Sequence, residues 1–281
     1  MRVSGRSGWQ GLVGLARISV LAAPTRSLPY ARTWAVWGKE LRRFALVHPD
    51  RSFMYAMVPK AANSTLRRLL WRHLGVDVSG PSLHRTLYMS SGPYAALPDL
   101  AHGERRRILK SPDVFRFSFV RNPYDRLRSA YIQKLHHPTT HERPAHYLAA
   151  LGLSEIPDFE TFVRTVVAQP DHLMNAHWRP QHRCLVMDAI AYDFIGKVET
   201  FEADFAYISE RLGFSPDLYR QTPPANRVRP ETRDLAIYTD ALAELVHRRY
   251  RLDFDRFDYA KDSYRRPDPR SSELGPFAGR G

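Results

Sequence analysis

Apolar runs of strand length recur along the chain, and each is followed by a short polar loop and then by a helical pattern. The strand-length runs lie at residues 52–58, 114–120 and 191–198, and the helical patterns follow at 64–74, 124–135 and 201–212. This alternation is typical of domains in which helices cross over between parallel strands. We therefore predict an α/β fold with a mostly parallel central sheet and helices on both faces. Ligands of such sheets bind at the carboxyl ends of the strands, so the loops that follow are candidate sites.

The length and composition are those of one large domain with loose ends. The chain has 281 residues, 43% of them hydrophobic, which is enough to bury a substantial core. We expect a flexible amphipathic segment at 1–48, the main domain at 49–262 and a disordered tail at 263–281. Arg17 interrupts the apolar run near the N-terminus, so no uncharged window reaches the roughly 18 residues that cross a bilayer. A peripheral amphipathic helix is expected there, with a poor signal peptide as the alternative.

Charge and cysteine content limit the classes of partner, metal site and cellular location that we expect. Lysine and arginine number 42 against 29 acidic residues, and the net charge of +13 predicts an anionic partner. The single cysteine, Cys184, excludes an internal disulfide and a thiolate-rich metal site. No acidic cluster of metal-binding type is visible, so we expect no metal. A reducing cytoplasm is the expected location, with membrane association through the N-terminal segment as the variant.

The first candidate loop is PKAANSTLRR, residues 59–68, between the first strand and its helix. Lys60 supplies a mobile charge, and residues 61–65 offer backbone N–H groups and hydroxyls at a helix start, which together suit a phosphate. An ordinary capped helix is the alternative. The loop lacks the glycines of GxxxxGK[ST], which argues against an ATPase, a GTPase or a P-loop kinase.

The second candidate loop, in FVRNPYDRLRSAY, places Arg121 directly after a strand and Ser129 about two helical turns later. An arginine fork suits bidentate binding of a phosphate dianion, and the Asn-Pro pair predicts a turn. Both side chains can reach one anion if the helix bends toward it. Alternatively, Arg121 forms a surface pair with Asp125.

Together these loops resemble the donor-binding segments of the sulfotransferases that use 3'-phosphoadenosine-5'-phosphosulfate (PAPS). FSFVRNPYDRLRSAYIQKL is similar to FxVRxPxERLxSAYxxKF, and PKAANSTLRR is similar to PKVGCSxWRR, of the family 2 carbohydrate group that includes the chondroitin 4-O and dermatan 4-O enzymes. The segments HWRPQHRC, YDFIGKVET and YRLDFDRFDY also resemble that group. The resemblance covers residues 53–259, and it departs from the group at Ala62, Asn63 and Thr65 of the first loop.

This resemblance implies a P-loop NTPase-like sulfotransferase fold and the transfer of a sulfuryl group from PAPS to a hydroxyl, most simply one on a glycan. It implies that Lys60 contacts the 5'-phosphosulfate and that Arg121 and Ser129 hold the 3'-phosphate. The remaining implied cofactor contacts are Ala61, Ala62, Asn63, Ser64, Thr65 and Arg227. In-line displacement of this kind depends on positioning and on fixed positive groups.

The acceptor hydroxyl needs a base, and histidine suits that role near neutral pH. We expect His84, which lies between the two loops in the sequence, to be the base. His102 and His177 are the alternatives. Asp113 and Glu199 are candidate bases only if burial raises the pKa of their carboxyl groups.

A protein that binds polyanions without chemistry is the alternative function. Its basic surface would hold a heparin-like glycan or a nucleic acid in a strongly salt-dependent way. Nucleic acid is the less favoured ligand, because the aromatic residues fall inside apolar runs and no helix-turn-helix or zinc-finger spacing is present. The oligomeric state cannot be predicted from these features.

Overall fold

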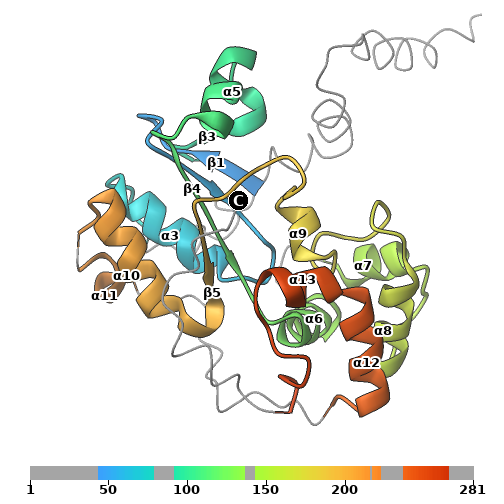
Figure 1. Ribbon diagram of the computed structural model, residues 1–281. Coiled ribbons are helices and arrows are strands. Elements are labelled where there is room, and N and C mark those ends of the chain that lie inside the picture. The colour runs from blue at the N-terminus through green and yellow to red at the C-terminus, as the bar shows by residue number, and fades with distance from the viewer. Residues whose placement is uncertain (1–43, 79–91, 137–142, 216, 223–236, 266–281) are drawn as a thin grey trace, which may run out of the picture.

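The centre of the molecule is a five-stranded sheet with the strand order β3-β1-β2-β4-β5 (Figure 1). The computed structural model describes residues 44–78, 92–136, 143–215, 217–222 and 237–265. Its strands are β1 (Ala45–Val47), β2 (Phe53–Ala56), β3 (Ala95–Ala96), β4 (Phe115–Val120) and β5 (Phe194–Lys197). The three strands expected from the sequence are therefore confirmed as β2, β4 and β5.

The sheet is mixed and not mostly parallel. β2 pairs with β4, and β4 with β5, in parallel, whereas β1 pairs antiparallel with both β2 and β3. Two of the four pairings between described strands are thus antiparallel, which corrects the expectation. The reason is the short connection at residues 48–52, because a short loop returns the chain in the opposite direction and a parallel neighbour requires a long crossover. β1 also lies before residue 49, so the sheet includes part of the expected N-terminal segment.

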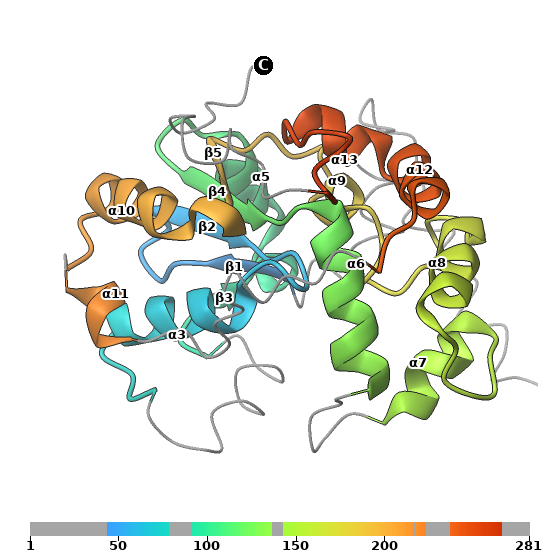
Figure 2. The same cartoon turned by 90° about the horizontal axis from the view of Figure 1, so that it is seen from below.

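Helices cover both faces of the sheet, as expected (Figures 1 and 2). Successive residues of β2 point to opposite faces: Tyr55 lies in one apolar cluster, whereas Met54 and Ala56 lie in the other. The Tyr55 cluster includes residues of α3 (Asn63–His73), α10 (Phe201–Leu212) and α11 (Leu218–Gln221). The second cluster includes residues of α5 (His102–Lys110), α6 (Pro123–Tyr131), α7 (Pro144–Leu151), α8 (Phe159–Ala168), α12 (Asp240–Arg249) and α13 (Arg251–Arg256).

One helix has the bounds that the sequence predicts, and others differ from the prediction. α10 has the expected bounds and ends at Gly213, whose φ of 66° allows the left-handed C-terminal cap. α7 lies where the sequence pattern predicts no helix, and it buries Tyr147, Leu148 and Leu151. α6 ends at Tyr131 and continues as a π-helical turn, η2 (Ile132–His136), where an α-helix was expected.

The carboxyl ends of β2, β4 and β5 lie at one edge of the sheet, because these strands run in the same direction. Residues 57–62 join β2 to α3, Arg121 and Asn122 join β4 to α6, and η3 (Val198–Thr200) joins β5 to α10. Gly196 in β5 permits close packing there, since a Cβ atom would lie 2.6 Å from the Phe119 ring. Both loops selected from the sequence therefore meet at this edge.

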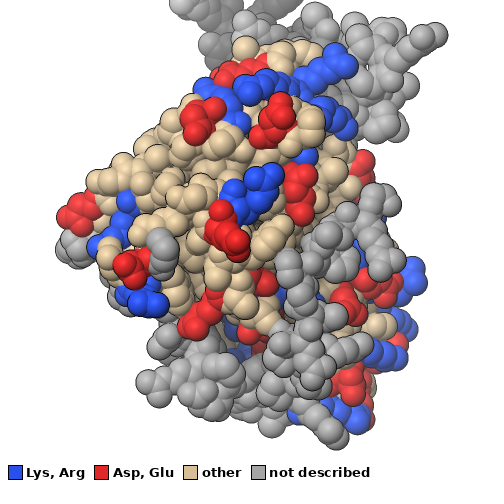
Figure 3. Space-filling model, turned by 60° about the vertical axis from the view of Figure 1, so that its left-hand side comes forward, with Lys and Arg blue, Asp and Glu red and all other residues tan. Residues whose placement is uncertain are grey.

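Basic side chains lie among acidic ones on the face shown in Figure 3. Some arginine side chains also form ion pairs with aspartates. Arg183 binds Asp171 at 3.0 Å and Asp188 at 2.5 Å, and Arg249 binds Asp171 at 2.6 Å. The chain has a net charge of +13, but the face in Figure 3 is not one uninterrupted basic surface.

Candidate functional site

The loop between β2 and α3 has an unusual backbone. Lys60 and Ala62 both lie in the left-handed region, with φ values of 72° and 55°. Non-glycine residues in this region cost of the order of 1–3 kcal/mol each and concentrate at ligand-binding loops. Between them, Ala61 is fully buried and donates its N–H to Val58 O at 3.1 Å. Left-handed residues in such loops turn successive N–H groups into one concave surface that binds anions.

The start of α3 has no internal cap. Ala62 is the N-cap and forms no side-chain hydrogen bond, and the first turn contains no acidic residue. Ser64 is half-buried, Thr65 is buried, and Asn63 Oδ1 accepts a hydrogen bond from Tyr55 Oη at 3.0 Å. An ordinary side-chain-capped helix is therefore not found here. The positive end of the helix dipole and its first N–H groups face the loop, as an anion site requires.

The Lys60 side chain reaches from this loop to the end of α6. Its Nζ donates a hydrogen bond to Oε1 of Gln133, which lies in η2. π-helical turns are rare and frequently occur at functional sites. The interaction places the ammonium group beside the carboxyl end of α6.

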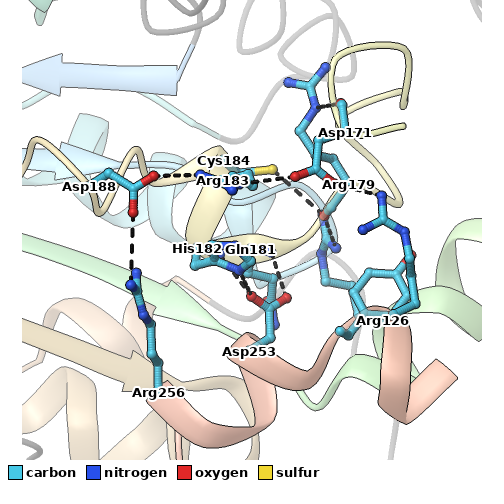
Figure 4. A network of polar contacts seen from close by, with 12 residues as sticks. Arg126, Asp171, Arg179, Gln181, His182, Arg183, Cys184, Asp188, Asp253 and Arg256 are labelled. Carbon is cyan, nitrogen blue, oxygen red and sulfur yellow. Dashed lines mark hydrogen bonds and ion pairs between the residues drawn. The ribbon is translucent and has the colours of Figure 1, made fainter. Parts of the chain in front are cut away.

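A buried arginine of α6 ties the same parts together. The guanidinium of Arg126 donates to Pro59 O at 2.9 Å, to Arg179 O at 2.7 Å and to Ala176 O at 2.7 Å (Figure 4). Ser129 follows Arg126 by three positions, so it lies on the same face of α6. Through Arg126, that face contacts the β2–α3 loop, which contains Lys60. Contact of Ser129 and Arg121 with one anion stays a prediction.

Arg121 follows the last residue of β4 and is half-buried. Its backbone N–H donates to Gln181 Oε1 at 2.9 Å, and its carbonyl accepts from Gln181 Nε2 at 2.7 Å. Nε of Arg121 is buried and has no hydrogen-bond partner among the described residues. The alternative surface pair with Asp125 is not found in this part of the chain, and Asp125 itself is buried. A buried guanidinium atom without a protein partner is what an anion-binding arginine provides.

Glu199 and Asn122 fix the turn after β4. Asn122 N donates to Glu199 Oε1 at 2.8 Å, and Tyr259 Oη donates to Glu199 Oε2 at 2.9 Å. Asn122 also caps α6 through Tyr124 N at 3.0 Å and donates to Ser263 Oγ at 2.7 Å. Burial raises the pKa of the Glu199 carboxyl group against the opposing effect of the Asn122 hydrogen bond. Because both carboxyl oxygens are engaged, Glu199 holds the turn.

The candidate bases lie in different places. His84 and Arg227 are outside the described residues. His102 is exposed at the start of α5, which leads into the amino end of β4, and Asp113 is exposed there too. His177 is half-buried, its Nδ1 lies 2.7 Å from Asn175 Oδ1, and it follows Ala176, whose carbonyl binds Arg126. Of the two described candidate histidines, His177 is the one that directly follows a residue, Ala176, bound by the same guanidinium as Pro59 of the β2–α3 loop.

The sequence analysis missed Arg126, Gln133, Gln181 and Asp253. α9 (Gln181–Cys184) begins at Gln181, and the buried Asp253 carboxylate of α13 accepts from its N–H at 2.6 Å. All four residues occur in segments that were noted: Arg126 and Gln133 in FSFVRNPYDRLRSAYIQKL, Gln181 in HWRPQHRC and Asp253 in YRLDFDRFDY. The motifs therefore contained these residues but did not indicate their roles. Among the described residues, no group of three or more His, Cys, Asp or Glu side chains could hold a metal ion.

Comparison with curated proteins finds carbohydrate sulfotransferases. Carbohydrate sulfotransferase 14 of Danio rerio is 31% identical over 261 residues, which cover 83% of this chain and 67% of that protein. The Mus musculus protein of the same name is 32% identical, over 79% of this chain and 61% of its own length. Carbohydrate sulfotransferase 11 of Mus musculus is 25% identical, over 79% and 69%. No solved structure matches the chain significantly.

The cytoplasmic location expected from the single cysteine is wrong by this comparison. The carbohydrate sulfotransferases to which the chain is similar are Golgi membrane enzymes. Cysteine count was a weak guide, because a chain with one cysteine folds without a disulfide in either redox environment. In the part of the chain that the structure describes, no helix combines the length and the apolar character needed to cross a bilayer.

The family comparison covers most of the chain. The profile of the sulfotransferase family matches residues 43–260, a range that starts just before β1 and ends just after Tyr259. This range contains both loops and the segments around Gln181 and Asp253. The resemblance seen in the sequence motifs is thereby confirmed. The chain belongs to the sulfotransferase family.

Proposed function

We propose that the chain transfers a sulfuryl group from PAPS to a hydroxyl group of a carbohydrate. The observation that carries the proposal is the meeting of two elements suited to anion binding at one sheet edge. One is the start of α3, which has no side-chain cap, with Lys60, and the other is Arg121, whose buried Nε has no hydrogen-bond partner among the described residues. A donor with phosphates at both its 5' and 3' ends requires two such elements. Family membership and relatives named carbohydrate sulfotransferases support the reaction class and the acceptor class.

In this proposal the 5'-phosphosulfate lies over the β2–α3 loop. The residues proposed to contact it there are Lys60, Ala61 and Ala62 of the loop, and Asn63, Ser64 and Thr65 at the start of α3. Arg121 and Ser129 hold the 3'-phosphate, and Arg227 completes the nucleotide site. Arg126 connects the two parts of this proposed site, because its hydrogen bond to Pro59 O fixes the β2–α3 loop relative to α6.

The reaction is an in-line displacement at sulfur. The acceptor oxygen bonds to sulfur as the bond from sulfur to the bridging phosphate oxygen breaks, which releases adenosine 3',5'-bisphosphate. Lys60 stabilises the charge that develops on the bridging oxygen, since a fixed cation outside bulk water is most effective there. A histidine accepts the proton of the acceptor hydroxyl, and we propose His84, with His177 as the second candidate. The proposed chemistry uses no metal, so activity should persist in EDTA.

Isothermal titration with adenosine 3',5'-bisphosphate and with 5'-AMP tests the donor site. We expect the wild-type protein to prefer the bisphosphate at least tenfold, because only that ligand carries the 3'-phosphate. Arg121→Ala should lose this preference. Arg164→Ala is the matched control, since Arg164 is exposed on α8 and pairs with Glu160.

Equal affinity of the wild-type protein for both nucleotides would contradict the donor assignment. Strongly salt-dependent binding of a heparin-like polyanion that ignores the 3'-phosphate would then favour the non-catalytic polyanion-binding alternative.

A further inference from the structure

Gln181 pairs with the backbone of Arg121 through its side chain. The amide oxygen accepts the Arg121 N–H at 2.9 Å, and the amide nitrogen donates to the Arg121 carbonyl at 2.7 Å. In an antiparallel ladder, two facing residues exchange the same two hydrogen bonds. The glutamine amide therefore takes the place of a neighbouring strand and continues the pairing of β4 one residue beyond Val120.

This contact lies where the sheet itself stops supporting the chain. The pairing of β4 with β5 ends with Val120 opposite Lys197, and the next residue but one, Asn122, is held by Glu199. Between these two supports, both hydrogen-bonding groups of the Arg121 backbone are bound by Gln181. Fixing the backbone of a residue fixes the direction of its Cα–Cβ bond, from which the guanidinium extends.

Gln181 is itself held in place from its other side. One oxygen of the Asp253 carboxylate accepts the Gln181 N–H at 2.6 Å. The other accepts the His182 N–H at 2.9 Å and lies 2.6 Å from His182 Nδ1 (Figure 4). Gln181 and Asp253 are both fully buried. A buried amide with all these partners has no alternative position, because any other would leave polar groups unpaired.

We propose that Gln181 is a positioning residue, which holds the Arg121 backbone so that the guanidinium is directed at the 3'-phosphate of the donor. The inference rests on the proposed function, since it assigns Arg121 to that phosphate. Glutamine suits the role because its amide offers a donor and an acceptor side by side. Ionised glutamate offers only acceptors, and methionine offers no hydrogen-bonding group of comparable strength.

The test measures how well the protein distinguishes two nucleotides. Dissociation constants for adenosine 3',5'-bisphosphate and for 5'-AMP are determined by titration for wild type, Gln181→Glu and Gln181→Met. We expect the preference for the bisphosphate to fall at least tenfold in both variants, toward that of Arg121→Ala. If Gln181 acts only on stability, both ligands weaken by one common factor and the preference is unchanged, which overturns the proposal.

Tyr192→Phe is the matched control. Tyr192 is buried and donates from its hydroxyl to Leu185 O at 2.8 Å, at the other end of α9. The substitution removes a buried hydrogen bond from the same helix without changing a contact of Arg121. We expect the melting temperature to fall while the nucleotide preference stays at the wild-type value.

The variants separate failure of this inference from failure of the proposed function. A wild-type protein without preference for the bisphosphate contradicts the donor assignment itself. A wild-type preference that Gln181→Glu retains in full overturns the positioning role and leaves the donor assignment intact. Gln181→Glu decides the outcome if Gln181→Met does not fold, because it keeps the shape and the bond from the Arg121 N–H.

Discussion

Lys60 combines a left-handed backbone, with a φ of 72°, and a charged side chain that extends to the end of α6. Its ammonium group donates to Gln133 of η2, across from the β2–α3 loop. The Gln133 amide is uncharged, so a phosphosulfate that replaces it as the partner of the ammonium group brings an opposite charge to Lys60.

Replacement of Lys60 by alanine tests the charge alone, because alanine keeps the Cβ atom and the backbone strain that goes with it. We expect kcat to fall about 10²- to 10³-fold at saturating PAPS, the range found when one group that stabilises developing charge is lost. Initial rates of sulfate transfer to a carbohydrate acceptor provide the measurement. Lys110→Ala, at an exposed position in α5, should retain wild-type rates, and normal turnover in Lys60→Ala would refute the assigned role.

Glu199 gives a pH dependence of stability whose sign follows from its raised pKa. Burial raises the pKa of this carboxyl group in the folded protein, so the folded state binds its proton more tightly than the unfolded state. The resulting stabilisation is full below the unfolded pKa of about 4.3 and is lost as the pH rises through the folded pKa. Glu199→Gln removes this loss, because the neutral amide does not ionise.

Urea unfolding between pH 4 and pH 8 measures the effect. The free energy of unfolding of Glu199→Gln, relative to wild type, should increase with pH. Glu210→Gln, at an exposed position of α10, should show no such trend. A constant difference between Glu199→Gln and wild type across the series would mean that the Glu199 carboxyl group titrates alike in both states.

At the scale of elements, the buried guanidinium of Arg126 ties α6 to the β2–α3 loop. Arg126→Met would leave the carbonyls of Pro59, Ala176 and Arg179 without this partner. Buried acceptors without partners cost about 1 kcal/mol or more each, so we expect a loss of about 3 kcal/mol in the free energy of unfolding.

Urea denaturation of Arg126→Met measures this loss from the shift of the midpoint. Arg164→Met removes an arginine whose pair with Glu160 is exposed, and it should cost less than about 0.5 kcal/mol. Equal stability of the two variants would show that Arg126 is not the link between the elements.

The elements that the sequence predicted are those with a strong apolar period. β2, β4, β5, α3, α6 and α10 are in this class. β1 has three residues, too few to show a period, and α5 buries only Ile108 and Leu109. The direction of β1 depends on the length of its connection to β2, which composition does not reveal.

The candidate site was predictable only where a residue type itself suggested chemistry. Lys60 and Arg121 were selected because a cation directly after a strand suits an anion. Arg126 and Gln181 bind backbone groups of distant segments, and every sequence offers such groups at every position. Their roles depend on tertiary structure and could not be read from spacing.

For the whole molecule, the site edge is assembled from segments that are far apart in the chain. Asn122 binds Glu199 and Ser263, and Gln181 binds Asp253. These contacts join positions between about 70 and 140 residues apart, so the edge forms only when the entire domain is folded. Ser263 and Tyr264 are buried in this arrangement, beyond the expected end of the domain at 262.

The late position of Asp253 and Ser263 also bears on biosynthesis. A ribosome has translated β2, β4, β5 and both candidate loops well before it reaches the codons for these two residues. Until then, the emerging polypeptide contains Lys60 and Arg121 but lacks the Asp253 carboxylate that holds Gln181 and the Ser263 hydroxyl that binds Asn122. A premature stop codon after residue 250 would thus spare every proposed donor ligand and still yield a protein unable to hold them in register.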